Sequence, residues 1–265
     1  MPKWKFGGFG TGFLTFLIGS VSVAEAEVAG VVGAVNTNAH GTPPGGASRG
    51  LSVGSDVVQK ERIQTDADGT AHIMFNDRSA LNIGRNSSIV IDNFVYNPGA
   101  SGQQSITLAR GALRFVGGQI SHSTEATVKT PAASIGVRGG NVTIVMEAQG
   151  HVVVMVHNGV AVVSNDFGSL TLRTGFQLIV VPGAPLGEPT RISLEYLREA
   201  TRRLASVGAQ KGGSLQPPTD ADAARNDIGL HRAPTISPNI DLPSAGDDLL
   251  RGKTTTQTKP LVYRP

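Results

Sequence analysis

The sequence has no cysteine among its 265 residues. Disulfide bonds, thiolate metal ligands and a cysteine nucleophile are therefore excluded. Aromatic residues are also scarce, at 5% of the chain, with one Trp and three Tyr. Few side chains are thus available for the stacking surfaces on which sugars or bases bind. Stability has to come from aliphatic burial and from backbone pairing.

Long apolar runs are missing too. A transmembrane helix needs about 20 apolar residues, whereas the apolar run at residues 13–23 has only eleven. Lys3 and Lys5 precede this run, and the small-x-small sequences Ser22-Val23-Ala24 and Ala24-Glu25-Ala26 follow it. This order is typical of a cleaved secretory signal peptide. We therefore predict a signal peptide at residues 1–24 and no membrane span after its cleavage, with a periplasmic or, alternatively, extracellular or cell-surface location.

Net charge gives no indication of a nucleic-acid partner. Without Lys3 and Lys5, the 23 basic residues fall to 21 against 20 acidic ones, which leaves a net charge of +1. No stripe of Lys and Arg interleaved with aromatic residues is present, and such a stripe would be the signature of a nucleic-acid surface. We expect no nucleic-acid binding.

Apolar residues alternate with polar ones over more than a hundred positions from Ala71 onward. The alternating apolar positions are Ala71, Ile73, Phe75, Leu81, Ile83, Ile89, Ile91, Ile106, Leu108, Leu113, Phe115, Ala126, Val128, Val142, Ile144, Met146, Val152, Val154, Val156, Leu170, Leu172, Leu178 and Val180. A period of two is typical of strands with one buried face. The sequence predicts an all-β domain over residues 25–192.

Glycine-containing sequences separate the alternating runs. They are Asp68-Gly69, Asn97-Pro98-Gly99, Gly117-Gly118, Gly139-Gly140 and Asn158-Gly159. Asn-Gly and Asp-Gly supply the positive φ that tight hairpins need. We interpret all five as turns between short strands.

The end of the chain has a different composition. Leu197, Ala200, Leu204 and Val207 recur at helical spacing behind Ser193, a residue type that caps helices. This predicts one amphipathic helix at residues 193–208, with a basic face of Arg198, Arg202 and Arg203. Residues 209–265 contain seven prolines and no sustained period, so we predict a disordered tail there.

A series of short segments follows in a characteristic order between Val28 and Ile192. The segments are residues 30–35, 51–57, 61–79, 86–88, 91–92, 108–114, 128–133 and 135–140. Together they resemble the FecR-type periplasmic signalling domain. The chain departs from the family pattern at Asp77-Arg78-Ser79, where the family has glycine in the middle, and at Gly139-Gly140, where it has Gly-Thr. It also begins with a signal sequence where the family's sigma-factor regulators carry a cytoplasmic segment and a membrane span.

The resemblance implies a short, twisted β-solenoid-like stack, and a two-layer β-sandwich explains the alternation as well. It implies an exported, non-enzymatic signalling or scaffolding module that binds another envelope protein. An exposed edge strand would accept a partner strand through backbone hydrogen bonds. The alternative is a secreted surface or matrix protein that binds polysaccharide.

Four motifs suggest chemistry without completing a site. Gly50-Leu51-Ser52-Val53-Gly54 has the spacing of a serine-hydrolase nucleophile elbow, which requires a strand–turn–helix context. His151 and His157 lie too far apart along a strand, at about 20 Å, to share one metal ion. Asp66-Ala67-Asp68-Gly69 lacks the late glutamate of a calcium loop, and Arg138 is flanked by glycines at a bend. We predict no catalytic residue, cofactor or metal ligand.

Overall fold

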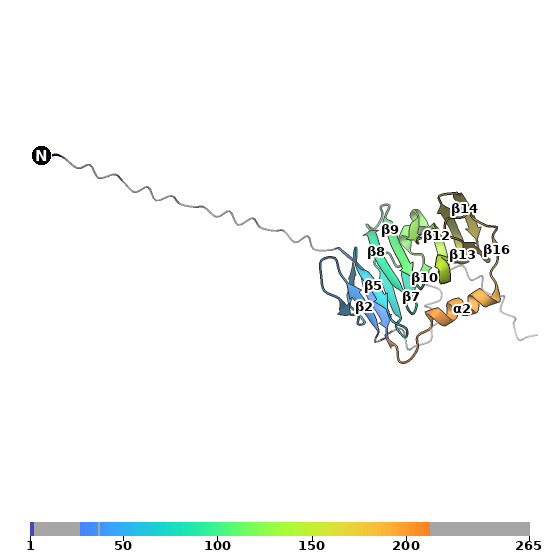
Figure 1. Ribbon diagram of the computed structural model, residues 1–265, viewed down its shortest axis with the longest axis horizontal. Helices are drawn as coiled ribbons and strands as arrows, with labels where there is room; N and C mark the ends of the chain where they lie inside the picture. The colour runs from blue at the N-terminus through green and yellow to red at the C-terminus, as the bar shows by residue number, and fades with distance from the viewer. Residues whose placement is uncertain (3–26, 37, 213–265) are drawn as a thin grey trace, which may run out of the picture. The chain divides into compact units, whose positions relative to one another are not determined.

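The computed structural model describes residues 1–2, 27–36 and 38–212 (Figure 1). The predicted signal peptide at residues 1–24 therefore lies almost entirely outside the described residues. The tail predicted for residues 209–265 lies outside them from residue 213 onward, while its residues Lys211 and Gly212 form a short strand. Within the described part, no helix is both long and apolar enough to cross a membrane.

The described chain is mostly β-structure, as the alternation predicted, and its strands form one hydrogen-bonded sheet. The strands are β1 (Val28–Val35), β2 (Ala39–Thr42), β3 (Arg49–Gly50), β4 (Asp56–Val58), β5 (Arg62–Thr65), β6 (Ala71–Phe75), β7 (Ala80–Ile83), β8 (Ser88–Val95), β9 (Gln103–Arg110), β10 (Ala112–Val116), β11 (Ala126–Lys129), β12 (Ser134–Met146), β13 (Val152–Asn165), β14 (Gly168–Arg173), β15 (Phe176–Val180), β16 (Thr190–Arg191) and β17 (Lys211–Gly212). Two α-helices, α1 (Gln119–Ser123) and α2 (Leu194–Leu204), and one 3-10 turn (Ala148–Gly150) complete the described elements.

The sheet curls over so that two halves face each other. One half, called the β8 half, runs in the order β3, β2, β5, β8, β9 and β11. The other, called the β10 half, runs β4, β1, β6, β7 and β10. The long strands β12 and β13 belong to both, because β12 pairs with β11 near its start and with β10 near its end. All pairings are antiparallel except that of β9 with β11, so the fold corresponds to the sandwich-like alternative and not to a solenoid of parallel turns.

The core lies between the two halves. Phe75 of β6 stacks on Phe94 of β8 with ring centroids 5.3 Å apart, which joins the halves directly. The predicted apolar positions are buried there, apart from Met146 and Leu170, which are half-buried. A smaller cluster lies on the outer face of the β10 half, where α2 packs its Ala200 onto Ala112, Val145, Val153 and Met155.

Gly139-Gly140 and Asn158-Gly159 are not turns, and this prediction was wrong. Both pairs lie inside the long strands β12 and β13, where the register shifts between Arg138 and Asn141. Gly139, Gly140 and Gly159 have φ of 60°, 86° and 85°, and a Cβ on Gly140 would collide with the carbonyl oxygen of Asn158. Positive φ serves bulges as well as hairpin turns. Here it bends both strands so that each contributes to both halves.

The helix predicted behind Ser193 is present as α2. The Ser193 side chain accepts a hydrogen bond from the backbone N–H of Tyr196 at 3.2 Å, as an N-cap does. The helix ends at Leu204 and not at the predicted Gly208. Its last turn is held by Arg85, whose backbone N–H and guanidinium donate to the carbonyl oxygens of Arg203 and Arg202. This tertiary cap ends the helix before the glycine.

Candidate protein-binding edge

Strand β14 forms one border of the β8 half (Figure 1). It follows β13 after a two-residue turn, Asp166-Phe167, and all six of its residues pair with β13. Among the described residues its register of pairing is with β13 alone, and β15 pairs with β13 and β16. Every second residue of an edge strand directs its N–H and C=O away from its neighbour. The outer side of β14 therefore offers a row of backbone donors and acceptors.

The other borders of the described sheet are shorter or covered. Strands β3, β4, β16 and β17 also pair on one side only, but none is longer than three residues. Strand β15 is partly covered by β16, and the loop after it folds back. In that loop the carbonyl oxygen of Ala184 accepts at 2.9 Å from the amide of Asn165, the β13 residue opposite Gly168 of β14, and Leu186 packs on the core. In the described part of the chain, β14 is thus the longest strand with a free side.

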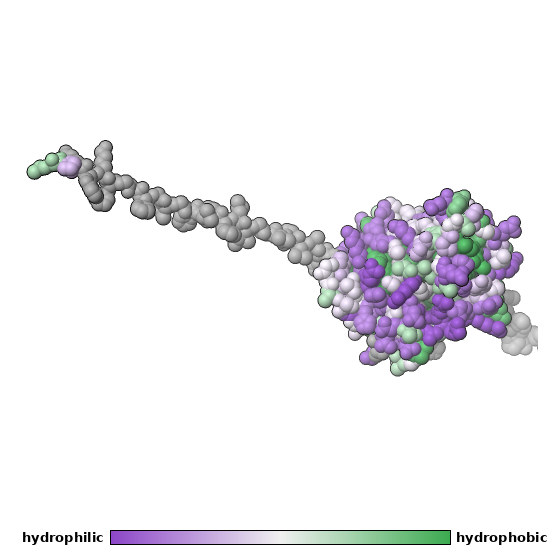
Figure 2. All heavy atoms as spheres, in the orientation of Figure 1, coloured by the Kyte–Doolittle hydropathy of each residue, from purple (hydrophilic) through white to green (hydrophobic). Residues whose placement is uncertain are grey.

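The side chains of β14 follow the alternation of a half-buried strand. Leu172 is buried and Leu170 half-buried on the core side, while Ser169, Thr171 and Arg173 are exposed on the outer side. Phe167 stands at the turn before the strand and is 57% exposed. Apolar surface is visible at this border in Figure 2. A strand added here would find apolar contacts as well as backbone partners.

Charge is distributed unevenly along this edge. The exposed Asp166 precedes β14, and the exposed Arg173 ends it. Arg191 lies beyond, with its guanidinium carbon 4.6 Å from the centre of the Phe176 ring. One end of the edge is therefore acidic and the other basic, so a bound strand would be oriented by its own charges.

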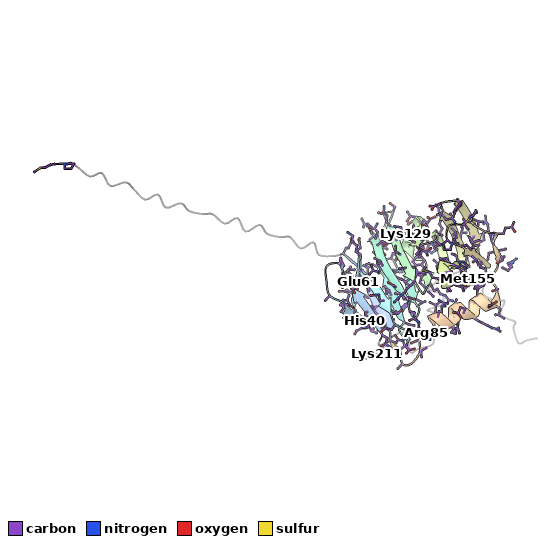
Figure 3. All side chains as sticks on the ribbon, viewed as in Figure 1. His40, Glu61, Arg85, Lys129, Met155 and Lys211 are labelled. Carbon is purple, nitrogen blue, oxygen red and sulfur yellow. The ribbon has the colours of Figure 1, made fainter. Side chains whose placement is uncertain are left out.

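A rigid loop lies beside the acidic end of β14. Thr130, Pro131, Ala132 and Ala133 connect β11 to β12, and together with Asn165 and Asp166 they line a shallow hollow. The hydroxyl of Thr130 donates to the carbonyl oxygen of Ala133 at 2.8 Å and accepts from its N–H at 3.0 Å. Lys129, labelled in Figure 3, also lines the hollow and pairs loosely with Asp92 at 3.9 Å. This loop adds a fixed surface to the edge.

Ser52 does not stand on a nucleophile elbow. Its carbonyl oxygen accepts from the N–H of Ser55 at 2.9 Å, and its own N–H donates to the Ser55 hydroxyl at 3.1 Å. Gly54, with φ of 81°, completes this turn. The chain then enters strand β4 and not a helix. The strand–turn–helix context that the motif requires is not formed at these residues.

The other motifs are not brought together into one site. His151 precedes β13, whereas the ring of His157 lies 2.9 Å from the Thr143 hydroxyl. Asp66 belongs to a turn in which its carbonyl oxygen accepts from the N–H groups of Gly69 and Asn86. The Arg138 side chain is 71% exposed and pairs with Glu125 at 3.6 Å. In the part of the chain that the structure describes, no three His, Asp or Glu side chains are grouped as a metal site.

Two buried carboxylates escaped the sequence analysis, and both hold turns. Glu61 is fully buried, accepts from the Val58 N–H at 3.0 Å and pairs with Arg49 at 2.9 Å (Figure 3). Asp77 is fully buried as well. It accepts from the N–H and the hydroxyl of Ser79 and from the N–H of Ile120. The signal in the sequence was the place of Glu61, Asp77 and Ser79 in the family-like segment 61–79.

Comparison with known proteins agrees with that segment. Residues 61–162 match the family described as FecR protein, which confirms the resemblance over these residues. The match ends at residue 162, within β13, and β14 begins at Gly168, outside the matched residues. No curated protein matches the chain.

Solved structures similar to the chain include two crystal structures of a candidate anti-sigma factor from Parabacteroides distasonis. They share 14% and 13% sequence identity with the chain, and both have a TM-score of 0.43. Each alignment covers 52% of this chain and 62% of the other.

Proposed function

Since residues 61–162 form a FecR domain, we propose that this chain is an exported signalling module of the bacterial envelope. It acts by binding another protein and not by catalysis. The free side of β14 carries this proposal, because a six-residue edge with one unpaired side is suited to strand addition. The partner strand completes the backbone hydrogen bonds of the edge.

The surroundings of β14 support binding at this place. Natural proteins protect long edge strands with proline, charge or a covering segment, and β15 is covered in part by β16. Strand β14 has no proline, and its single charge, Arg173, stands at its end. Among the described residues no strand pairs with its outer side, and the loop after β15 meets the chain only beside its start, where Asn165, opposite Gly168, donates to Ala184. An unprotected edge strand of this length would promote aggregation unless a partner strand covers it.

The non-enzymatic part of the proposal is supported by where the polar residues lie. Asp77, Ser79 and Glu61 are buried and use their oxygens on backbone or side-chain donors inside the fold. Ser52 lies in a β-turn. The hydrogen bonds of this turn join Ser52 to Ser55 and do not involve a side chain that could act as a base. These groups maintain turns and do not face a substrate.

Polysaccharide binding ranks second. The outer face of the β8 half carries Asp92, Ser105 and Thr107, but the hydroxyls of Thr107 and Ser105 both donate to the Asp92 carboxylate, at 2.7 Å and 3.3 Å. The one aromatic residue classed as exposed in the described part is Phe167, just before β14. A row of exposed rings, which would favour sugar binding, is not formed there.

Site-directed photocrosslinking in intact bacteria tests the proposal. A photoreactive amino acid is placed at Thr171 of β14 in the full chain, and at the exposed Arg62 of β5 as the matched control. We expect a discrete protein adduct from position 171 and none from position 62. Absence of an adduct at Thr171, or equal adducts at both positions, would refute binding at this edge.

The predicted export of the chain is tested in the same bacteria. Fractionation followed by mass spectrometry of the N-terminus should find the chain outside the inner membrane, beginning near Glu25 or Glu27. Uncleaved protein in the inner membrane would contradict the export proposal and would favour an anchored regulator.

A further inference from the structure

The edge of β14 is complementary to itself. Asp166 and Phe167 stand before the strand and Arg173 ends it, and all three are exposed. Two such edges related by a twofold axis run antiparallel, so each end of one strand meets the opposite end of the other. The acidic end of each copy then meets the basic end of its partner.

We infer that the strand received by β14 is β14 of a second copy of this chain. The inference rests on the proposed function, because it names the partner of the same edge. Isologous pairing of two edges uses the free side of each strand. The remaining one-sided strands are at most three residues long in the described part, so the assembly stops at a dimer and does not grow into a fibre.

The alternation of β14 restricts the register of this pair. Opposite residues of an antiparallel pair share a face of the sheet, so Leu170 and Leu172 must lie opposite core-side residues and Thr171 opposite an outer residue. The register that pairs the whole edge places Leu170 opposite its symmetry mate. Ser169 then lies opposite Thr171, and Gly168 opposite Leu172.

This register also gives the two exposed ends a partner. Arg173 of one copy lies opposite Phe167 of the other and beside its Asp166. A guanidinium over an aromatic face is attracted by the ring, as Arg191 and Phe176 already show within one chain. Both contacts occur twice in the dimer because of the symmetry.

Dimer formation also buries apolar surface on the core side of the paired strands. Leu170 is only half-buried in the single chain, and its symmetry mate would cover it. Apolar burial and completed backbone hydrogen bonds then act together. Self-association should therefore be specific to β14 and dependent on concentration.

Sedimentation of the purified mature chain over a concentration series measures the dimer. We expect Asp166→Arg and Arg173→Glu each to raise the dimer dissociation constant at least about tenfold, because each variant brings like charges together in its own homodimer. Arg110→Glu, the same charge change at an exposed site at the end of β9, should leave the dissociation constant unchanged.

Mixing the two variants gives the decisive measurement. In a dimer of Asp166→Arg with Arg173→Glu, every contact between the ends again joins opposite charges. We expect the mixture to recover association close to that of the unmodified chain. A general effect on folding could not produce this rescue, and circular dichroism of each variant should show an unchanged strand spectrum.

Two results would overturn the inference. One is a chain that stays monomeric over the whole series. The other is a mixture that associates no better than either variant alone. If the chain is monomeric and the crosslink from Thr171 still captures a different protein, the homodimer is wrong and the proposed function stands. If no adduct forms at all, the proposed function fails with it.

Discussion

The hydroxyl oxygen of Thr143 lies 2.9 Å from Nε2 of His157, on the outer face of the β10 half. The same oxygen accepts a hydrogen bond from Nε of Arg114 at 3.1 Å. Its own proton is therefore free to be donated to His157, and a ring nitrogen accepts only when it is deprotonated. Burial lowers the pKa of His157, and the charge of Arg114 lowers it further. The fold favours the neutral imidazole.

Stability should consequently fall in mild acid. The pKa of His157 is lower in the folded chain than its ordinary 6.5. The stabilisation that neutral His157 gives to the fold is therefore complete above pH 6.5 and is lost as the pH falls below 6.5. His157→Gln keeps an acceptor for Thr143 and cannot be protonated. We expect its melting temperature to fall less than that of the unmodified chain between about pH 7.5 and about pH 5.

His72 provides the comparison for this experiment. Burial lowers the pKa of His72 as well, so the double variant with His72→Gln should be less sensitive still. An equal fall in melting temperature for all three proteins would show that neither histidine is responsible.

Asp77 should be the most sensitive acidic position in the fold. It is fully buried, and its carboxylate accepts from Ser79 twice and from Ile120 once. Asp77→Ala leaves these donors without a partner, and we expect a loss of about 3–5 kcal/mol in the free energy of unfolding. Asp77→Asn, which retains one acceptor oxygen, should lose less.

Urea denaturation measures both variants. The exposed Asp68→Ala serves as the control, since surface substitutions usually change stability by no more than about 0.5 kcal/mol. A loss for Asp77→Ala as small as that of the control would show that the buried carboxylate is dispensable.

Arg78 stores backbone strain between two buried residues. Its φ is 66°, a left-handed conformation at the position where the family pattern has glycine. Such a conformation costs a non-glycine residue about 1–2 kcal/mol, and the greater freedom of unfolded glycine offsets about 0.4–1 kcal/mol. Arg78→Gly should therefore raise stability by about 0.5–1 kcal/mol. In the extended strand β5, Arg62→Gly should lower stability by a similar amount, and a loss in both would contradict the assignment of strain.

The strands could be predicted because their signal is local. Ile73 and Phe75 share a face whatever the neighbouring strand is, since side chains alternate along any strand. The N-cap at Ser193 was equally local, because its partner, the N–H of Tyr196, is three residues away.

The missed features all depend on contacts distant in sequence. Gly140 marks a bulge and not a turn because Asn158 crosses close to it. Helix α1 begins where it does because Asp77, more than forty residues earlier, accepts from the N–H of Ile120. Strand β14 has a free side only because the other strands pair among themselves. The sequence therefore predicted that some edge strand is exposed, but it could not identify β14 as that strand.

The last prediction concerns how much of the C-terminal part the fold needs. Strand β17 pairs Lys211 and Gly212 with Val35 and Ala34 of β1. Residues 213–265 have the proline-rich, aperiodic composition from which the disordered tail was predicted. A chain ending at Gly212 should therefore melt within about 3 °C of the full chain, and one ending at Gly208 should lose about 1 kcal/mol with the β17 pairing.

A chain ending at Ile192 makes the contrast. It lacks α2 and exposes Val145, Val153 and Met155, which are buried beneath the helix. Exposure of a buried Val or Met side chain costs about 1.5–3 kcal/mol, so this chain should lose at least about 4 kcal/mol or aggregate. Differential scanning calorimetry of the three truncated chains measures their melting temperatures and so ranks their stabilities. If the chain ending at Gly212 lost as much stability as the chain ending at Ile192, residues 213–265 would have to contribute to the core, contrary to the dispensable tail predicted from their composition.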